Sequence, residues 1–320
     1  MASLCSHHFA FARSEYAPRA LQPLSVSPKL AQKLRIGATP SVTELAPPII
    51  HPARGSLPVL LSVPHSGRDY PDWLVESAAA GRPALASLED PLVDRLVWRA
   101  LKRGCGAVIA RTPRAAVDCN RAEDDVDPSV VDGARRGRVT ARARGGLGIV
   151  PSRTQQHGYL WRRPISPAAL ADRLDQAHRP YHRAIEEQIG LLLDRFGCAL
   201  LIDCHSMPPP PAGTPPIVFG DCRGRTADAW LSRNAVEVAR SCGFEAGLND
   251  PFAGGHVIDR HACPPRNVHA LQLEVDRRYY LDEGLREPGS GFDRVASFVD
   301  ALAAELGEAL LGRQFATAAE

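Results

Sequence analysis

Two apolar, strand-like runs of the chain lead to the same dipeptide, His-Ser, and this repeat constrains the fold more than any other feature. One run, Val59–Val63, leads to His65, and the other, Ala199–Cys204, leads to His205. In open α/β sheets the residues that do chemistry lie beyond the carboxyl ends of the strands. We therefore predict that the imidazoles of His65 and His205 converge on one metal ion.

A third strand-like run, near residue 270, is polar on one face only. Gln272 and Glu274 share a face because successive side chains of a strand alternate, whereas the aliphatic residues around them share the other face. A carboxylate in so apolar a strand is costly to bury unless it is paired or used. We therefore expect Glu274 to have a catalytic role.

Strand-like and helix-like segments alternate along the chain. Strands are predicted at 58–63, 106–111, 115–119, 199–204, 217–219 and 270–275. Helices are predicted at 90–103, at 167–196 with an interruption near Pro180, at 226–242 and at 291–312. The alternation predicts an α/β fold, a single domain with a central mixed, largely parallel sheet flanked by helices.

Two segments lack a regular hydrophobic period. Residues 1–50 mix Ser, Pro, Ala and scattered charges, so we expect an N-terminal arm, mobile or loosely packed, followed by a catalytic domain at 51–320 with an ordered core from about Leu57. Residues 121–164 are rich in Gly, Arg and Asp. A loop of that length in a compact domain is usually functional, such as a lid or a substrate wall.

Charge and cysteine content exclude several classes of protein. The net charge of +2, from 38 basic and 36 acidic residues, does not favour nucleic acid or anionic lipid as a partner. The basic run 135–144 has few aromatic neighbours, so we interpret it as an arginine-lined loop over an anionic ligand rather than an RNA-binding surface. The eight cysteines form no Cys-x-x-Cys pair, and we expect them to be reduced.

The chain contains neither a secretory signal pattern nor an apolar run of about 18 residues of the kind a membrane span requires. We expect a cytoplasmic protein without a membrane partner.

A metal held by His65 and His205 needs a further ligand, because catalytic zinc usually takes three protein ligands. Asp90 and Asp94 are the candidates. Asp90 followed by Pro91 is also a common helix start, and Asp94 would otherwise be a solvated carboxylate on a helix face. We predict Asp90 as the third ligand, with Asp94 as the alternative. This donor set suits zinc but admits other first-row ions.

An apolar segment ends in Asn120-Arg121, a pair that could hold a substrate carboxylate through an amide donor and a planar guanidinium fork. The alternative is an exposed ion pair of Arg121 with Asp124 or Asp125. Asp203, two residues before His205, would either accept a hydrogen bond from that imidazole or line the site.

These motifs, in this order, resemble the N-formylglutamate amidohydrolase family over roughly residues 57–310. The matching segments are Ser62–Gly67, Asp90–Leu96, Val117–Arg121, Pro180–His182, Asp203–Pro208, Asn249–Gly255 and Leu271–Glu283. The family is distantly similar to the zinc carboxypeptidases, so the resemblance implies a zinc-carboxypeptidase-like sheet. One departure matters: the carboxypeptidase pattern has a ligating Glu three residues after its first His, where this chain has Arg68.

The resemblance also implies the role of each site residue. His65 and His205 would bind zinc, and Glu274 would act as general base. Asn120, Arg121 and Ser206 would bind the substrate, and either Arg142 or Arg144 would hold a second carboxylate.

The activity implied is hydrolysis of N-formyl-L-glutamate to formate and L-glutamate, a step of histidine degradation. The partner would be a small acidic N-acyl amino acid. Two alternatives stay open: an amidohydrolase for another N-acyl amino acid, and a non-catalytic carboxylate- or RNA-binding protein on a hydrolase frame. The sequence gives no indication of the oligomeric state.

Overall fold

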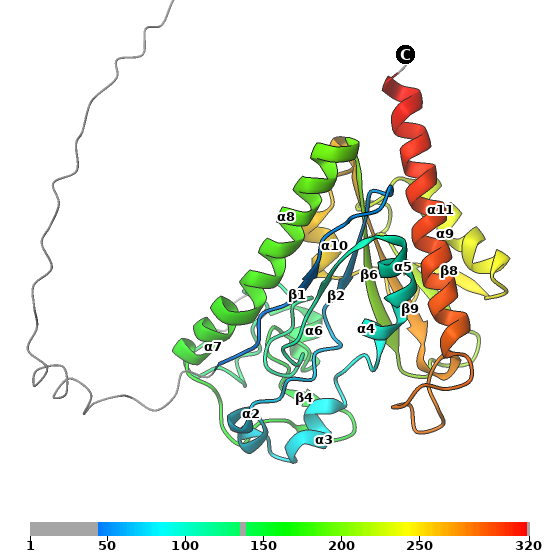
Figure 1. Ribbon diagram of the computed structural model, residues 1–320. Helices are drawn as coiled ribbons and strands as arrows, with labels where there is room; N and C mark the ends of the chain where they lie inside the picture. The colour runs from blue at the N-terminus through cyan, green and yellow to red at the C-terminus, as the bar shows by residue number, and fades with distance from the viewer. Residues whose placement is uncertain (1–43, 135–138, 319–320) are drawn as a thin grey trace, which may run out of the picture. The chain divides into compact units, whose positions relative to one another are not determined.

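The computed structural model describes residues 44–134 and 139–318, with side chains to residue 316, and is built on a seven-stranded sheet (Figure 1). The strand order is β1-β3-β2-β6-β9-β7-β8. The strands are β1 (Ile49–His51), β2 (Val59–Val63), β3 (Gly106–Ile109), β6 (Ala199–Met207), β7 (Ile217–Gly220), β8 (Ala246–Leu248) and β9 (Val268–Asp276). Strands β3, β2, β6 and β9 run parallel, whereas β1 and β7 are antiparallel to their inner neighbours. The predicted mixed, largely parallel sheet is confirmed.

Helices and short turns connect these strands. The helices are α2 (Asp72–Ser77), α3 (Gly81–Ala86), α4 (Val93–Leu96), α5 (Trp98–Arg103), α6 (Ala141–Arg144), α7 (Pro167–Arg173), α8 (Arg179–Phe196), α9 (Ala229–Ser241), α10 (His256–His261) and α11 (Phe292–Ala318). One π-helical turn, η1 (Leu174–His178), joins α7 to α8, and 3-10 turns lie at η2 (Pro264–Arg266) and η3 (Arg277–Tyr279). A small hairpin pairs β4 (Arg153–Thr154) with β5 (Gly158–Tyr159).

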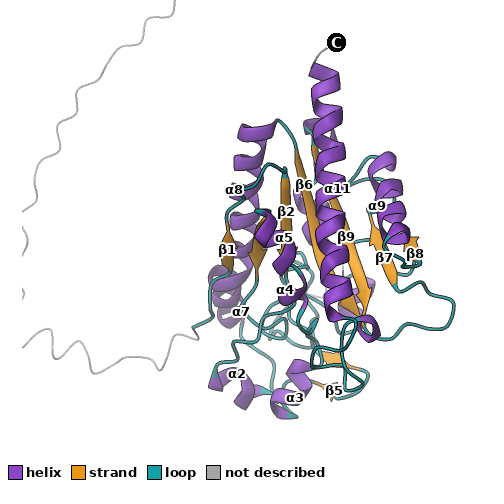
Figure 2. Ribbon diagram, turned by 45° about the vertical axis from the view of Figure 1, so that its right-hand side comes forward, coloured by secondary structure: helices purple, strands orange, loops and turns teal. Residues whose placement is uncertain are grey.

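Alternating strand residues pack against helices on both faces of the sheet. Val59, Leu61 and Val63 of β2 point into a core shared with α4, α5, α9 and α11. Leu60 points the other way, into a core with α8 and α10. Figure 2 shows α11 and α8 on opposite sides of the strands. Burial on both faces explains why these strands read as continuous apolar runs.

The edge strands β1 and β8 have no counterpart in the sequence-based prediction, and three predicted segments also differ. Residues 115–119 are not a strand, because Ala115, Ala116 and Val117 pack in an apolar cluster separate from the two cores of the sheet. The helix predicted from residue 90 begins at Val93, after a left-handed Leu92 with φ 60°. Strand β6 continues past Cys204 to Met207, so His205 lies within the strand rather than after it.

The ordered part of the domain begins before Leu57. Leu45 is buried, and β1 pairs antiparallel with β3. Residues 1–43, the rest of the expected N-terminal arm, lie outside the described residues, as do residues 135–138 of the predicted arginine loop. The seven cysteines in the described part of the chain are free thiols. None of the helices there is long and apolar enough to cross a membrane.

Candidate functional site

The two histidines predicted from the strand ends meet over one carboxylate. His65 lies just beyond the end of β2, and His205 lies near the end of the neighbouring strand β6, with ring centroids 4.7 Å apart. The Oδ2 atom of Asp90 is 3.3 Å from His65 Nδ1 and 3.0 Å from His205 Nδ1. Each of the three residues is only 3% exposed. The structure therefore brings together the predicted ligand set.

Two further carboxylates fix the orientation of the imidazoles. Nε2 of His65 lies 2.7 Å from Asp118 Oδ1, and Nε2 of His205 lies 2.9 Å from Asp203 Oδ2. Ser62 in turn donates a hydrogen bond to Asp203. A carboxylate behind each Nε2 favours a proton on that nitrogen, which leaves Nδ1 to face the centre. Asp203 thus has the supporting role that the sequence left open.

The centre fits a divalent metal ion. His65 Nδ1 is buried and has no hydrogen-bond partner, and one donor atom from each of His65, Asp90 and His205 lies within 4.8 Å of the other two. Two imidazoles and a carboxylate, each imidazole backed by an acid, form a donor set typical of zinc. These residues could therefore hold a metal.

The electrostatics of the centre favour a cation. Burial raises the pKa of Asp90, but the adjacent imidazoles of His205 and His65 outweigh it and hold that pKa well below its usual range. Burial lowers the pKa of His205, yet Asp203 and Asp90 together raise it well above its usual range. Both shifts make a positive charge beside the Asp90 carboxylate favourable.

Asp94, the alternative third ligand, is occupied elsewhere. Its carboxylate accepts two hydrogen bonds from Arg68, at 3.1 and 2.6 Å. Asp90 is not the N-cap of the following helix, since Leu92 has that position. The helix-start interpretation of Asp90 is therefore wrong, and its carboxylate is available to the two histidines.

Glu274 lies beside the group formed by His65, Asp90 and His205. Strand β9 pairs with β6 in a register that sets Glu274 directly opposite His205. The Gln272 amide, on the same face of β9, donates a 3.0 Å hydrogen bond to Glu274 Oε1. Burial is the main cause that raises the pKa of Glu274 to about 7, and Asp90 adds to it while His205 opposes it. A carboxyl group with such a pKa can both accept and return a proton near neutral pH.

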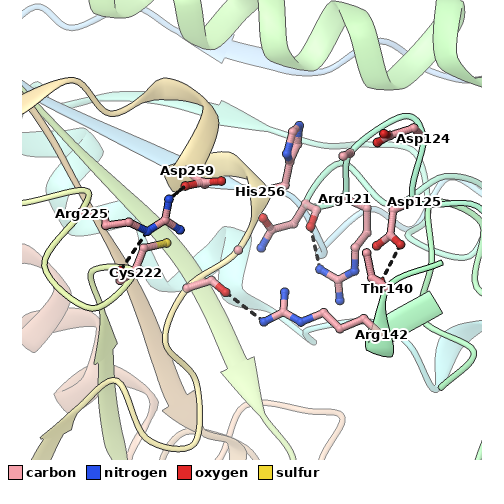
Figure 3. Close-up of a pocket in the computed structure, with 13 residues that line it drawn as sticks. Arg121, Asp124, Asp125, Thr140, Arg142, Cys222, Arg225, His256 and Asp259 are labelled. Atoms are coloured by element: carbon pink, nitrogen blue, oxygen red, sulfur yellow. Dashed lines mark hydrogen bonds and ion pairs between the residues drawn. The ribbon is translucent and has the colours of Figure 1, made fainter. Parts of the chain in front are cut away.

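A cavity of about 410 Å³ opens over these groups. Its lining includes the three ligand candidates and Glu274, and it also includes four arginines: Arg114, Arg121, Arg142 and Arg277. A neighbouring cavity of about 330 Å³ shares Asn120, Arg121 and Arg142 with it (Figure 3). So many guanidinium groups around one cavity suit a substrate that carries more than one carboxylate.

The arginines predicted to bind substrate differ in their placement. Arg121 lines both cavities and donates to the carbonyls of Leu147 and Asn120, rather than pairing with Asp124 or Asp125. Arg142 also lines both cavities and donates to the Gly254 carbonyl. Arg144 is exposed, donates to the Val139 carbonyl and lines neither cavity. The structure therefore does not bring Arg144 to the site.

Asn120 lies closer to the candidate metal ligands than expected. Its Nδ2 is 3.1 Å from His205 Nε2, and its Oδ1 accepts a hydrogen bond from the backbone of Val257. Ser206 lines the larger cavity, and its Oγ accepts a hydrogen bond from Arg277 Nε.

Three site residues are missing from the sequence-based prediction. Asp118 supports His65, and Arg114 donates to Asp118 at 2.9 Å. Arg277 donates to Asp90 Oδ1 at 3.1 Å while lining the cavity. Asp118 could have been found in the sequence from its position two residues before Asn120. Arg277 could have been found from its position at the carboxyl end of the strand that carries Glu274.

Sequence comparison identifies relatives of this chain. Residues 57–281 match the family model described as N-formylglutamate amidohydrolase. An N-formylglutamate deformylase of Pseudomonas putida is 28% identical over 269 residues, which cover 81% of this chain and 94% of that protein. A second, from Pseudomonas aeruginosa, is 29% identical over 238 residues, or 72% and 84% of the two chains.

A crystal structure of N-formylglutamate amidohydrolase from Ralstonia eutropha superposes with a TM-score of 0.76 at 28% identity, covering 83% of this chain and 99% of that one. The match of the family model spans well over half of the residues and includes the three ligand candidates and Glu274. This chain therefore belongs to the N-formylglutamate amidohydrolase family.

Proposed function

We propose that this chain is a zinc-dependent amidohydrolase that cleaves the formyl amide of N-formyl-L-glutamate, giving formate and L-glutamate, as in histidine degradation. The observation that carries the proposal is that one cavity is lined by His65, Asp90 and His205 together with Glu274 and four arginines. Family membership and the deformylase relatives support the same reaction.

His65, Asp90 and His205 would hold the metal through the atoms that already face one another. A divalent ion bound there supplies Lewis-acid chemistry, because it polarises a carbonyl group and lowers the pKa of water to about 7. Asp118 and Asp203 keep the two imidazoles in the orientation that this binding needs.

Glu274 would move the proton of the hydrolysis. Its carboxylate takes a proton from the water that adds to the formyl carbon and delivers it to the amide nitrogen as the carbon–nitrogen bond breaks. The oxygen of water ends in formate, and the nitrogen leaves as the amine of glutamate. Gln272, which donates to Glu274 Oε1, holds the carboxylate in place through this cycle.

The arginines would supply substrate affinity. The formyl group is too small to contribute much binding energy, so the two carboxylates of the glutamate half must supply it. Arg121 and Arg142 line both cavities, whereas Arg114 and Arg277 line the larger one, close to Asp118 and Asp90. We assign the substrate carboxylates to Asn120, Arg121 and Arg142.

The test is release of the free amino acid from N-formyl-L-glutamate, N-acetyl-L-glutamate and N-formyl-L-glutamine, with formate as the second product of the two formyl compounds. Zinc content is determined on the same preparation. The proposal expects turnover that follows zinc content and prefers the formylated diacid. Preference for the acetyl compound would instead support an amidohydrolase for another N-acyl amino acid. Tight binding of all three compounds without turnover would support a non-catalytic carboxylate-binding protein.

A further inference from the structure

A second cluster of histidines lies outside the site described above, between α8 and α10. His178 ends the π-helical turn η1, and His182 follows on α8 one helical turn later. His256 begins α10, and His261 ends it. Ring centroids lie 4.4 Å apart for His178 and His182, 5.3 Å for His182 and His256, and 6.2 Å for His178 and His256. Positions i and i+4 put the first two on one face of the helix.

Two ring nitrogens of the cluster are buried without a partner. His178 Nε2 lies 2.8 Å from the Arg121 carbonyl oxygen, which can only accept, so Nε2 carries the proton and Nδ1 holds a free lone pair. His178 Nδ1 and His182 Nε2 are both buried and have no hydrogen bond, in residues 0% and 1% exposed. Buried polar atoms are nearly always bonded, so two unbonded nitrogens in one cluster point to a missing ligand.

The remaining contacts keep the rings neutral and oriented. His182 Nδ1 lies 2.8 Å from His261 Nε2, and a proton on His182 Nδ1 leaves its Nε2 as an acceptor. Oε1 of Glu123 lies 3.8 Å from His178 Nδ1, too far for a hydrogen bond. Burial lowers the pKa of all four histidines, to about 4 for His256 and about 3 for His261. Neutral imidazole is the form that binds metals.

We propose that His178, His182 and His256 form a second metal site, for a divalent transition ion such as zinc. One ring nitrogen from each lies within 4.8 Å of the other two. Zinc–nitrogen bonds of about 2.0–2.1 Å place tetrahedral ligands about 3.4 Å apart, so modest ring rotations would close the set. His256, which is partly exposed, has the most freedom to make that movement.

The site has a route for the ion and a structural consequence. His256 lines the smaller cavity, and Figure 3 shows its ring turned away from Arg121 and Arg142 of the same cavity. A bound ion would link α8 to α10. The turn η1, which leads into α8, and helix α10 also touch the substrate-binding segment, through the His178 bond to the Arg121 carbonyl and the Val257 bond to Asn120. The ion would therefore stabilise the wall that carries Asn120 and Arg121.

The test is the zinc stoichiometry of the full chain after chelator treatment, zinc addition and desalting. All proteins carry His7→Asn and His8→Asn, because two adjacent histidines near the terminus would add weak binding. Variant A adds His65→Asn and His205→Asn, variant B adds His178→Asn and His256→Asn, and the control adds His51→Asn. Circular dichroism of the chelated proteins checks that each is folded.

We expect two zinc ions per chain in the parent and the control, one in each of A and B, and none when A and B are combined. Zinc should also raise the melting temperature of A, but not of the combined variant. His256→Asn alone, at a partly exposed position, should lose one ion if B does not fold. Retention of the parent stoichiometry by B or His256→Asn, or absence of zinc from A, would overturn the second site.

Discussion

The two buried histidine clusters use the same side chain in opposite surroundings. Around His65 and His205 stand four buried carboxylates, and Asp203 and Asp90 in particular raise the pKa of His205 well above its usual range. Around His178 and His182 the nearest neighbours are other imidazoles, and burial lowers the pKa of each ring. The comparison teaches that carboxylate neighbours, rather than burial alone, decide whether an imidazole cluster attracts a proton or remains neutral.

Removal of a histidine from the carboxylate-rich cluster should have the largest effect. His65→Ala and His205→Ala should each reduce formate release to background and lower bound zinc, because each removes a donor and leaves carboxylates facing one another. Zinc content and formate release, measured together, check this. If either purified variant retains full zinc at this centre, the ligand assignment is wrong.

Glu274→Gln should separate catalysis from metal binding. The variant keeps the shape and the Gln272 contact region but cannot accept a proton, so kcat should fall at least ~10²-fold, the low end for general-base catalysis. Zinc content and the melting temperature should remain near those of the wild type. Near-normal turnover would remove Glu274 from the mechanism.

Arg121→Lys should test the substrate wall. An ammonium group cannot reproduce a guanidinium fork, and loss of one charge-assisted contact is worth about 1.5–3 kcal/mol, or roughly ten- to a hundred-fold in kcat/KM. The variant should also discriminate less between N-formyl-L-glutamate and its monoamides. If it keeps the wild-type preference for the free diacid, the carboxylates bind at other arginines, with Arg142 the first to examine.

Arg144→Lys is the matched control for Arg121→Lys. Its side chain is exposed and lines neither cavity, so we expect kcat/KM within about twofold of the wild type. A loss as large as that of Arg121→Lys would mean that the loop carrying Arg144 closes over the substrate.

The histidine-only cluster should make metal-free protein sensitive to mild acid. The folded pKa of His261, about 3, lies below the ordinary value of 6.5, so the unfolded chain binds more protons between these values. This contribution to stability is complete above pH 6.5 and is lost as pH falls toward 3. From pH 7 to pH 5, we expect the loss to be about 1–2 kcal/mol for this residue.

Urea denaturation of chelated wild type and His261→Gln at the two pH values measures this contribution. The variant should lose less stability than the wild type over the same interval. Equal losses in both proteins would show that His261 takes up its proton in the folded state as readily as in the unfolded chain.

The sequence predicts the central strands of the sheet and the polar residues near their carboxyl ends well, because local patterns determine them. Continuous apolar runs identify β2, β6 and β9, and the polar residues at their ends identify His65, His205 and Glu274. The segment Ala115–Val117 is equally apolar but packs in a different cluster. An apolar composition favours burial, and it does not by itself specify pairing in a strand.

Contacts between distant residues are what the sequence does not predict. Asp118 supports a histidine 53 positions away, and Arg277 reaches a carboxylate 187 positions away. The second histidine cluster joins segments 79 positions apart at the His182–His261 contact, although the i, i+4 spacing of His178 and His182 was visible. Such pairings depend on how α8 and α10 pack on the sheet, which no local pattern specifies.

The account depends most on the claim that the centre at His65, Asp90 and His205 hydrolyses N-formyl-L-glutamate with a bound metal. Formate release by chelator-treated protein, before and after addition of zinc, tests that claim directly. We predict no release above background before addition and full release after it, with His205→Ala inactive in both conditions. Equal rates of release with and without zinc, in protein shown to be metal-free at the start, would contradict it.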